Sequence, residues 1–272
     1  MLALEGPATA AIAGLAFVLG AALGSFANVV IRRLPAGESL LRPPSHCPVC
    51  QHGLRASDNV PILSWLWLRG RCRYCRTPIP LRYPLVEAAS GGICLLALAA
   101  YGASWQALAY GSFGIWLLVL AAIDLETLTL PETLTRSGLL AGLGVRILLS
   151  WQETGPGIAQ QLALGIGGAV LGLWLLEGIA LAGSLALGQP AMGGGDAKLA
   201  AGIGAWLGWQ QLLLAGFLAC LSGAIAGGAA IVVGARGRRQ PLPFGPFLAL
   251  GAGLSLMGGE ALLAAYRDWL WP

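Results

Sequence analysis

Two aspartates that border apolar segments are the residues of this sequence with the strongest potential for chemistry. Asp124 ends one apolar run in AIDLETLTLPE, and Asp196 lies in GGGDAK at the head of another. Carboxylates are rare in such positions, and each one indicates a functional site. If the two lie at the same membrane face, repulsion keeps both from ionising easily, and near neutral pH they share one proton. One carboxylate then activates water while its protonated partner polarises a carbonyl, which is the chemistry of an aspartic protease.

The residues around Asp196 suit a site that admits another chain. Three consecutive glycines precede it: Gly193, Gly194 and Gly195. Glycines relax the backbone and permit close approach, and the dipole of a helix starting here favours the ionised form of Asp196. Lys198 is expected to anchor the helix at the headgroups or to support the active site. Structural roles remain the alternatives: a helix end for Asp124 and an N-cap for Asp196.

Four cysteines form a second group with chemical potential. They occur as two CxxC pairs with 21 residues between them: Cys47, Cys50, Cys72 and Cys75. This spacing is typical of a tetrahedral four-thiolate zinc site in which each pair forms a tight knuckle. Such a site is structural, because it has no open coordination position. His46 and His52 flank the first pair as alternative ligands or solvated residues, and two disulfides are the alternative to zinc.

The composition that surrounds these residues is that of a membrane protein. The chain has 272 residues and only 10% charged residues, against roughly 25% in a soluble domain, and its mean hydropathy is +0.74. A soluble globular enzyme is therefore excluded. The first apolar run, 8–31, precedes Arg32 and Arg33 instead of following positive charges, so it is a retained helix and not a cleaved signal peptide.

Apolar segments predict an all-α polytopic membrane protein with about eight transmembrane helices. Beyond the first run they occupy 84–101, 105–123, 134–151, 157–187, 198–209, 210–233 and 246–266. A span needs about 20 apolar residues; segment 198–209 is short, and 157–187 is long enough to tilt or to contain a break. Glycines inside these runs, as in GIGGAVLG and GAIAGGAA, are expected to let helices pack closely.

Charge sets the expected orientation. Nine of the 16 Lys and Arg residues lie between Arg32 and Arg82, so the positive-inside rule makes the segment after the first helix a cytoplasmic loop. An outside N-terminus then places loops 32–83, 124–133, 188–197 and 234–245 inside, and 102–104 and 152–156 outside. Both aspartates fall at the cytoplasmic face. Arg146 lies toward the other side and counts against this orientation. The basic loop has no recognised nucleic-acid-binding motif.

Taken in order, the motifs of the chain resemble those of the bacterial type IV prepilin peptidases, which are GxGD-type membrane aspartyl proteases. The resemblance rests on GSFANVVIRRLP at 24–35, CPVC at 47–50, NVPILSWLWLRGRCRYC at 59–75, RYPLVE at 82–87, Asp124 followed by Pro131, GGGDAK at 193–198 and FGPFL at 244–248. It covers nearly the whole chain. It divides the chain into a first transmembrane helix (1–31), a cytoplasmic four-cysteine zinc loop associated with methyl transfer (32–83) and a helical peptidase core (84–272).

The resemblance implies two activities at the bacterial inner membrane. The enzyme would cut the leader from type IV prepilins and type II secretion pseudopilins after a glycine, at the cytoplasmic face, with Asp124 and Asp196 as the catalytic pair. It would then methylate the new N-terminal residue with S-adenosylmethionine as methyl donor. Because all four cysteines are present, both activities are expected. Prepilins, pseudopilins and membrane lipid are the expected partners, and nucleic acid is not.

Two departures and two alternatives accompany this resemblance. The family commonly has Pro-Asp after the first catalytic aspartate, whereas this chain has Pro131-Glu132, which affects fine positioning. The loop between Pro35 and Cys47 is short, which bears on methyl transfer more than on proteolysis. A peptidase that only cleaves, with a purely architectural zinc loop, is one alternative. A proton-coupled transporter is the other; it accounts for the aspartates but not for the cysteine pairs.

Overall fold

The computed structural model describes residues 7–151, 157–189, 192–234, 237 and 242–270. Over these ranges the regular secondary structure is helical, apart from two isolated β-bridges. The long helices are α1 (Pro7–Arg33), α3 (Arg82–Tyr101), α4 (Trp105–Thr127), α5 (Glu132–Ser150), α6 (Ile158–Leu187), α7 (Gly194–Leu207), α8 (Trp209–Val232) and α9 (Gly245–Leu270). A short 3₁₀ turn η1 (Ala56–Asn59) and a short helix α2 (Leu63–Trp67) lie in the cysteine loop.

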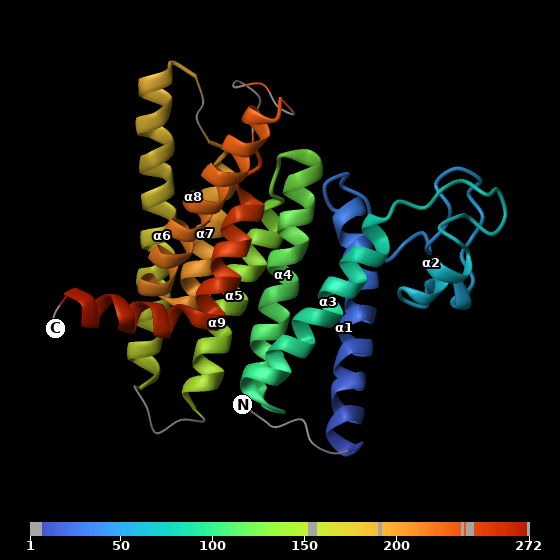
Figure 1. The fold of residues 1–272 in the computed structure, drawn as a ribbon, viewed down its shortest axis with the longest axis horizontal. Helices are drawn as coiled ribbons and strands as arrows, with labels where there is room; N and C mark the ends of the chain where they lie inside the picture. Colours follow the sequence, from blue (N-terminus) through green and yellow to red (C-terminus); the bar gives the residue numbers. More distant parts are fainter. Residues whose placement is uncertain (1–6, 152–156, 190–191, 235–236, 238–241, 271–272) are drawn as a thin grey trace. The chain divides into compact units, whose positions relative to one another are not determined.

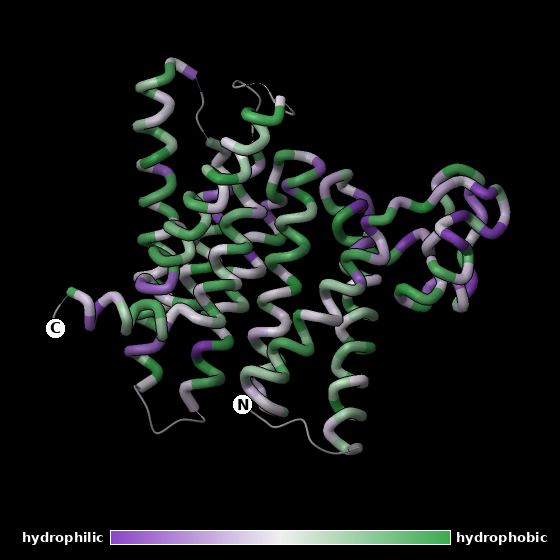
Figure 2. Tube along the Cα trace, viewed as in Figure 1, coloured by the Kyte–Doolittle hydropathy of each residue, from purple (hydrophilic) through white to green (hydrophobic). Residues whose placement is uncertain are grey.

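The chain forms two compact units, residues 1–119 and 120–272. In the first unit, α1 lies along α3 (Figure 1). The two helices approach closely at Gly24, where an added Cβ would lie 2.7 Å from the Cα of Glu87. Figure 2 shows that hydrophilic positions of this unit gather in the cysteine loop and at the end of α1 that leads into it. The polar loop is thus joined to an apolar helix pair.

In the second unit, α7 is the central helix. It contacts α5, α6, α8 and α9 (Figure 1), and ten of its 14 residues are buried. Its contact with α6 is made by backbone: a Cβ on Gly168 would overlap the carbonyl group of Gly204, and one on Gly172 would lie 2.6 Å from the carbonyl oxygen of Ala200. The indole of Trp206 donates a hydrogen bond to the carbonyl of Gly138 on α5, at 2.8 Å. These contacts fix α7 along its length.

The glycine prediction is therefore correct for one motif and not for the other. GIGGAVLG supplies Gly165, Gly168 and Gly172 to the helix contacts. In GAIAGGAA, by contrast, Gly228 has open space where a side chain would lie, and Gly223 would make only an ordinary contact. Small residues in an apolar run mark a close contact only where the neighbouring backbone is within reach.

The eight predicted helices are present within a few residues of their expected ends, but eight membrane spans are not confirmed. Six helices are long and apolar enough to cross a membrane: α1, α3, α4, α6, α8 and α9. Helix α7, at 14 residues, extends only about 21 Å at 1.5 Å per residue, less than the roughly 30 Å of hydrocarbon. Helix α5 carries charged residues, among them Arg136 and Arg146. The predicted connection 152–156 lies outside the described residues.

Arg146 has a structural explanation that its sequence position did not reveal. Its Nε donates to the carbonyl of Ala205 in the last turn of α7, at 2.9 Å, and its Nη1 donates to Oε1 of Gln161 on α6, at 2.9 Å. A cation at a helix C-terminus satisfies free carbonyls and interacts favourably with the dipole. Arg146 therefore stabilises helix packing, and its charge is a weak guide to membrane orientation. Long helix α6 is continuous over its 30 residues.

Candidate active site and metal centre

Asp124 lies near the end of α4, where its carboxylate meets the start of another helix. Its side chain is only 5% exposed, and its Oδ2 accepts a hydrogen bond from the backbone N–H of Gly245, at 2.9 Å. Gly245 opens α9, and a Cβ there would lie 2.8 Å from that same oxygen. Only glycine therefore lets the two helix ends approach this closely. Asp124 does more than end a helix, because its carboxylate joins α4 to α9.

Asp196 is the third residue of α7 and does not cap it. The N-cap is Gly193, which makes no side-chain hydrogen bond to the helix, so the N-cap alternative is wrong. Asp196 is 9% exposed. Burial, and then the charge of Asp124, raise the pKa of Asp196 to about 7. The expected effect of the helix dipole, which favours the ionised form, is opposed by loss of water and by the nearby carboxylate.

The two aspartates thus lie in one electrostatic field, at a point where the ends of three helices come together. Asp124 comes from the end of α4, Asp196 from the start of α7, and Gly245 from the start of α9. The charge of Asp124 raises the pKa of Asp196, which indicates that the two carboxyl groups lie close together. A pair of this kind holds one proton near neutral pH. Such an arrangement can both accept and donate a proton to a peptide group.

The glycines before Asp196 differ in what surrounds them. A Cβ on Gly195 would lie 2.9 Å from the Cβ of Leu130, so this glycine admits the segment that joins α4 to α5. Gly193 and Gly194 have open space at the same position. Among the described residues, a side chain at Gly193 or Gly194 would meet no neighbour, and room for another chain there stays a prediction. Gly195 instead seats a residue of this same chain.

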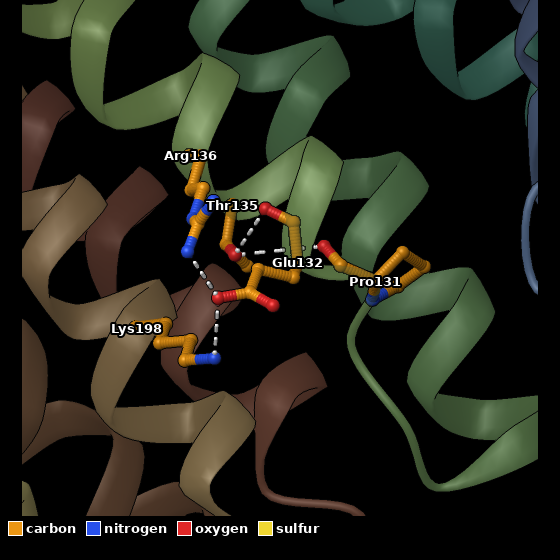
Figure 3. Close-up of polar contacts among 5 residues, drawn as sticks. All are labelled: Pro131, Glu132, Thr135, Arg136 and Lys198. Carbon is orange, nitrogen blue, oxygen red and sulfur yellow. Dashed lines mark hydrogen bonds and ion pairs between the residues drawn. The ribbon is translucent and has the colours of Figure 1, made fainter.

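Lys198 pairs with Glu132, the residue that follows Pro131. Its Nζ donates to Oε1 of Glu132, at 3.1 Å, and the same oxygen lies 2.8 Å from Nη2 of Arg136 (Figure 3). Both cations lower the pKa of Glu132, Lys198 most. Thr135 Oγ1 donates to the Glu132 carbonyl at 3.1 Å, in the first turn of α5. The cluster joins the starts of α5 and α7 at half-exposed side chains, so its energy is small.

The four cysteines converge as two matched knuckles. In the first, the N–H of Cys47 donates to the carbonyl of His52 and the N–H of Gln51 donates to that of Cys47; Cys72, Thr77 and Arg76 repeat the pattern in the second. Each knuckle is closed by a β-bridge, His46 to Gly53 and Arg71 to Pro78. The residue after each second cysteine has a positive φ, 58° at Gln51 and 61° at Arg76. The spacing predicted this local fold correctly.

The sulfur atoms fit a tetrahedral metal ion. All four lie within 4.8 Å of one another, and the Sγ atoms of Cys47 and Cys75 are 3.7 Å apart, close to the roughly 3.8 Å edge that Zn–S bonds of about 2.3 Å impose. Hydrogen bonds from Thr77, its hydroxyl first, lower the pKa of Cys75 to about 6, whereas burial and the neighbouring thiols raise the pKa of Cys50 to about 11. The four thiols therefore ionise in steps, with Cys75 the first thiolate available to a metal. All six cysteines are free thiols, so the disulfide alternative is not realised in this structure.

The two histidines beside the first knuckle have other partners. Nδ1 of His46 lies 2.9 Å from the carbonyl of Pro44, and the ring of His52 packs on Tyr74 with centroids 3.8 Å apart. Over the part of the chain that the structure describes, the candidate metal cluster consists of the cysteines alone. A four-thiolate centre is the arrangement that the geometry supports.

Two functional contacts escaped the sequence reasoning. The amide of Gly245 on Asp124 is one. The other is Glu87, whose Oε2 accepts a hydrogen bond from the N–H of Ile62 at 2.7 Å, joining the cysteine loop to α3. A buried carboxylate in an apolar segment was the available signal for Glu87, but a sequence does not reveal which backbone amide it meets.

Comparison with known proteins gives one consistent result. A profile of the Bacterial Peptidase A24 N-terminal domain matches residues 18–101, and one of the Type IV leader peptidase family matches residues 111–228. The chain is 42% identical to the prepilin leader peptidase/N-methyltransferase of Burkholderia pseudomallei, over 90% of this chain and 84% of that protein. It is 36% identical to the protein of the same name from Aeromonas hydrophila, over 93% and 92%. No solved structure gives a significant match.

Proposed function

The chain belongs to the Type IV leader peptidase family, and on that premise we propose that it is a bifunctional prepilin leader peptidase and N-methyltransferase. It cleaves the leader of type IV prepilins and type II secretion pseudopilins after a glycine, and it methylates the new N-terminal residue. The observation that carries the peptidase half is the pair of buried aspartates, Asp124 and Asp196, at the meeting of three helix ends.

The two carboxyl groups divide the work of hydrolysis. Asp196, with its pKa raised to about 7, holds the shared proton and donates it to the oxygen of the scissile carbonyl. Asp124 accepts a proton from water as the water oxygen attacks the carbonyl carbon. Collapse of the tetrahedral intermediate breaks the C–N bond, the proton on Asp124 passes to the leaving amine, and a hydroxyl of the intermediate returns its proton to Asp196. The pair is then ready for the next substrate.

The residues around the pair position it. Gly193 leaves space beside the start of α7 for an extended peptide. Gly195 admits Leu130 and so seats the connection that follows α4. Lys198 holds the first turn of α7 to α5 through Glu132. Each of the three supports the geometry of the carboxyl groups and takes no part in proton transfer.

The proposed membrane topology has an outside N-terminus and eight crossings. In it, neighbouring helices surround the short α7 and the charged α5 where these two do not match the bilayer by themselves. The cytoplasmic loops are then 32–83, 124–133, 188–197 and 234–245. Both aspartates lie at the cytoplasmic face of the inner membrane. A prepilin has a cytoplasmic leader and an apolar helix in the bilayer, so its scissile bond lies at that boundary. The proposed parts are the first helix (1–31), the zinc loop (32–83) and the peptidase core (84–272).

The cysteine loop serves the second activity. Its four thiolates hold a structural zinc ion, for which the sulfur positions are suited. S-adenosylmethionine, when bound, supplies a methyl group on a sulfonium centre to the new terminal amine. Prepilins and pseudopilins are the protein partners, membrane lipid surrounds the helices, and nucleic acid has no part.

The test is mass spectrometry of a prepilin incubated with the detergent-purified protein, with and without S-adenosylmethionine. Loss of the leader plus one added methyl group on the new N-terminus is the expected result. Leader loss without methylation would leave a peptidase whose cysteine loop is architectural. If no prepilin is cleaved, while proteoliposomes show an ion flux that Asp196→Asn removes, the protein is a transporter.

A further inference from the structure

The first unit contains a cavity of about 380 Å³ that the peptidase chemistry does not use. Its walls come from the end of α1, from the start of α3 and from both cysteine knuckles of the loop between them. The volume lies within the roughly 300–1,000 Å³ of small-molecule sites. Cys47 and Cys72, one cysteine from each knuckle, line it, so the metal centre shapes one of its walls.

Asn28, a residue of the cavity wall, carries a buried polar atom without a hydrogen-bond partner. Asn28 on α1 is 2% exposed, and its Nδ2 donates to the carbonyl of Tyr83 at 3.1 Å. Its Oδ1 has no hydrogen-bond partner. A buried acceptor left without a donor costs about 1–3 kcal/mol. Because Asn28 belongs to the cavity wall, a ligand with an N–H or O–H group at this end would satisfy it.

A buried carboxylate lines the same cavity. Glu87 on α3 is 8% exposed. Its Oε2 accepts a hydrogen bond from the amide of Ile62 at 2.7 Å, and a side-chain hydrogen bond with Ser25 on α1 also holds the carboxylate. Ile62 has a φ of 62°, a rare conformation for a β-branched residue. The loop thus holds a strained turn against this carboxylate. A buried acid favours a ligand that brings a positive charge or several donors.

The remaining walls carry charges of both signs, among them those of Glu38, Asp58 and Arg33, and an aromatic face. The guanidinium of Arg33, 8% exposed, lines the cavity and donates to the carbonyl of Ser39 at 3.0 Å. The indole of Trp65 is held by its hydrogen bond to the Ile79 carbonyl, at 3.1 Å. Gly70 has a positive φ of 66°, and a Cβ there would lie 2.8 Å from the same indole. The ring is therefore fixed in place, as a stacking surface requires.

We propose that this cavity is the binding site for S-adenosylmethionine. The ligand combines a planar base, hydroxyl and ammonium donors, a carboxylate and a sulfonium charge, and the cavity offers a counterpart to each kind of group. Trp65 provides a face for the base, Arg33 a partner for the carboxylate, and Glu87 a counter-charge for the cationic end. Asn28 accepts a hydrogen bond from one of the donors. The inference rests on the methyltransferase half of the proposed function.

The proposal also assigns a role to the metal centre. The knuckles contribute Cys47 and Cys72 to the cavity wall, and the turn at Ile62 places the loop against Glu87. The metal would thereby build a wall of the methyl-donor site without touching the donor.

The test is isothermal titration of the zinc-loaded, detergent-purified protein with S-adenosylmethionine. Glu87→Gln keeps an acceptor for the Ile62 amide but removes the charge, and Asn28→Leu removes the orphaned oxygen. Each is expected to weaken binding about tenfold or more, the scale of a hydrogen bond to a charged group. Glu260→Gln, an exposed carboxylate on α9, is the matched control and should leave the Kd unchanged. Zinc content and melting temperature check that each variant is folded.

Hydrogen exchange provides a measurement that needs no variant. S-adenosylmethionine should slow exchange in peptides covering 24–33 and 58–66, and leave 209–232 unchanged. If the wild-type protein binds the donor while neither variant weakens it and neither peptide is protected, the donor binds elsewhere; the cavity assignment falls, and the methyltransferase stands. If the wild-type protein cleaves prepilin but does not bind or use the donor, the methyltransferase half of the proposed function fails together with the cavity assignment.

Discussion

The aspartate pair and the cysteine knuckles are both made of residues far apart in the chain, but they are held together by different forces. Asp196 stands on α7, whose backbone packs on that of α6, as between Gly204 and Gly168, and Asp124 is tied to the start of α9 by the amide of Gly245. The knuckles lie in a polar loop that lacks a large apolar core, where the four sulfur atoms provide the tie. The first site is therefore set by helix packing, and the second depends on an ion. Changes that act on one should spare the other.

Replacing either aspartate gives the largest expected effect. Asp124→Asn or Asp196→Asn should reduce leader cleavage by about 10³-fold or more, because a pair that must both hold and accept a proton loses one partner. The measurement is the rate of prepilin cleavage by purified protein. Methylation of an already processed pilin should persist in both variants. Near-normal cleavage by either variant would remove the aspartates from the mechanism.

Loss of one zinc ligand is the converse change. Cys72→Ser should release the metal and destabilise the loop, because metal binding and folding are coupled in such small elements. Elemental analysis of the purified protein measures zinc, and limited proteolysis measures loop order. Methylation should be lost while cleavage persists. Wild-type protein with no zinc and four titratable thiols would contradict the metal centre.

The dependence of cleavage on pH tests the aspartate site separately from the cysteine site. Hydrolysis requires the proton on Asp196, whose pKa burial and Asp124 raise to about 7. Cleavage, as kcat/KM, should therefore fall about tenfold per unit as pH rises above about 7.

The same raised pKa of Asp196 predicts how the stability of the folded protein changes with pH. The folded protein binds this proton more tightly than the unfolded chain, so the stabilisation is full below the unfolded pKa near 3.8 and is lost as pH rises through about 7. Asp196→Asn should therefore melt at a higher temperature than wild type at pH 8, with the difference vanishing toward pH 4. A difference that is independent of pH would contradict the assigned shift.

The close packing of α7 on α6 can be tested by adding one methyl group. Gly204→Ala places a Cβ against the backbone of Gly168, and overpacking of this kind costs about 1–3 kcal/mol. The melting temperature should fall, and cleavage should fall with it as α7 shifts. Gly178→Ala on α6 is the control, because nothing lies within 4 Å of its added Cβ. Equal melting of the two variants would show that the α6–α7 approach is looser than described.

The smallest effect is expected at the surface cluster. Glu132→Gln breaks the pairs with Lys198 and Arg136, and half-exposed ion pairs contribute about 0–1 kcal/mol. Stability should change by no more than this, and cleavage by less than about threefold. A large loss of cleavage with normal melting would instead make Glu132 part of the peptidase site.

Residue type and spacing predicted the contacts between residues close together in the chain. The structure was needed for the contacts between residues far apart in it. The knuckles follow from two CxxC pairs because each closes within eight residues. The helices follow from the lengths of the apolar runs. The partner of Asp124 is a backbone amide 121 residues away, and every residue except proline has such an amide, so no side-chain pattern identifies it. The number of spans stays a prediction for a related reason: six helices are long and apolar enough to cross a membrane, whereas α7 is apolar but has only 14 residues.

The shortness of α7 also bears on how the reaction obtains its water. With 14 residues and neighbours on most sides, α7 covers only about two thirds of the hydrocarbon thickness. The interior of a membrane tolerates non-helical backbone only where protein or water surrounds it. Asp196 stands at the end where α7 begins. In the proposed topology, a helix this short would leave room for a hydrated recess at its start, so that peptide hydrolysis would proceed at a depth from which lipid alone would exclude its second reactant.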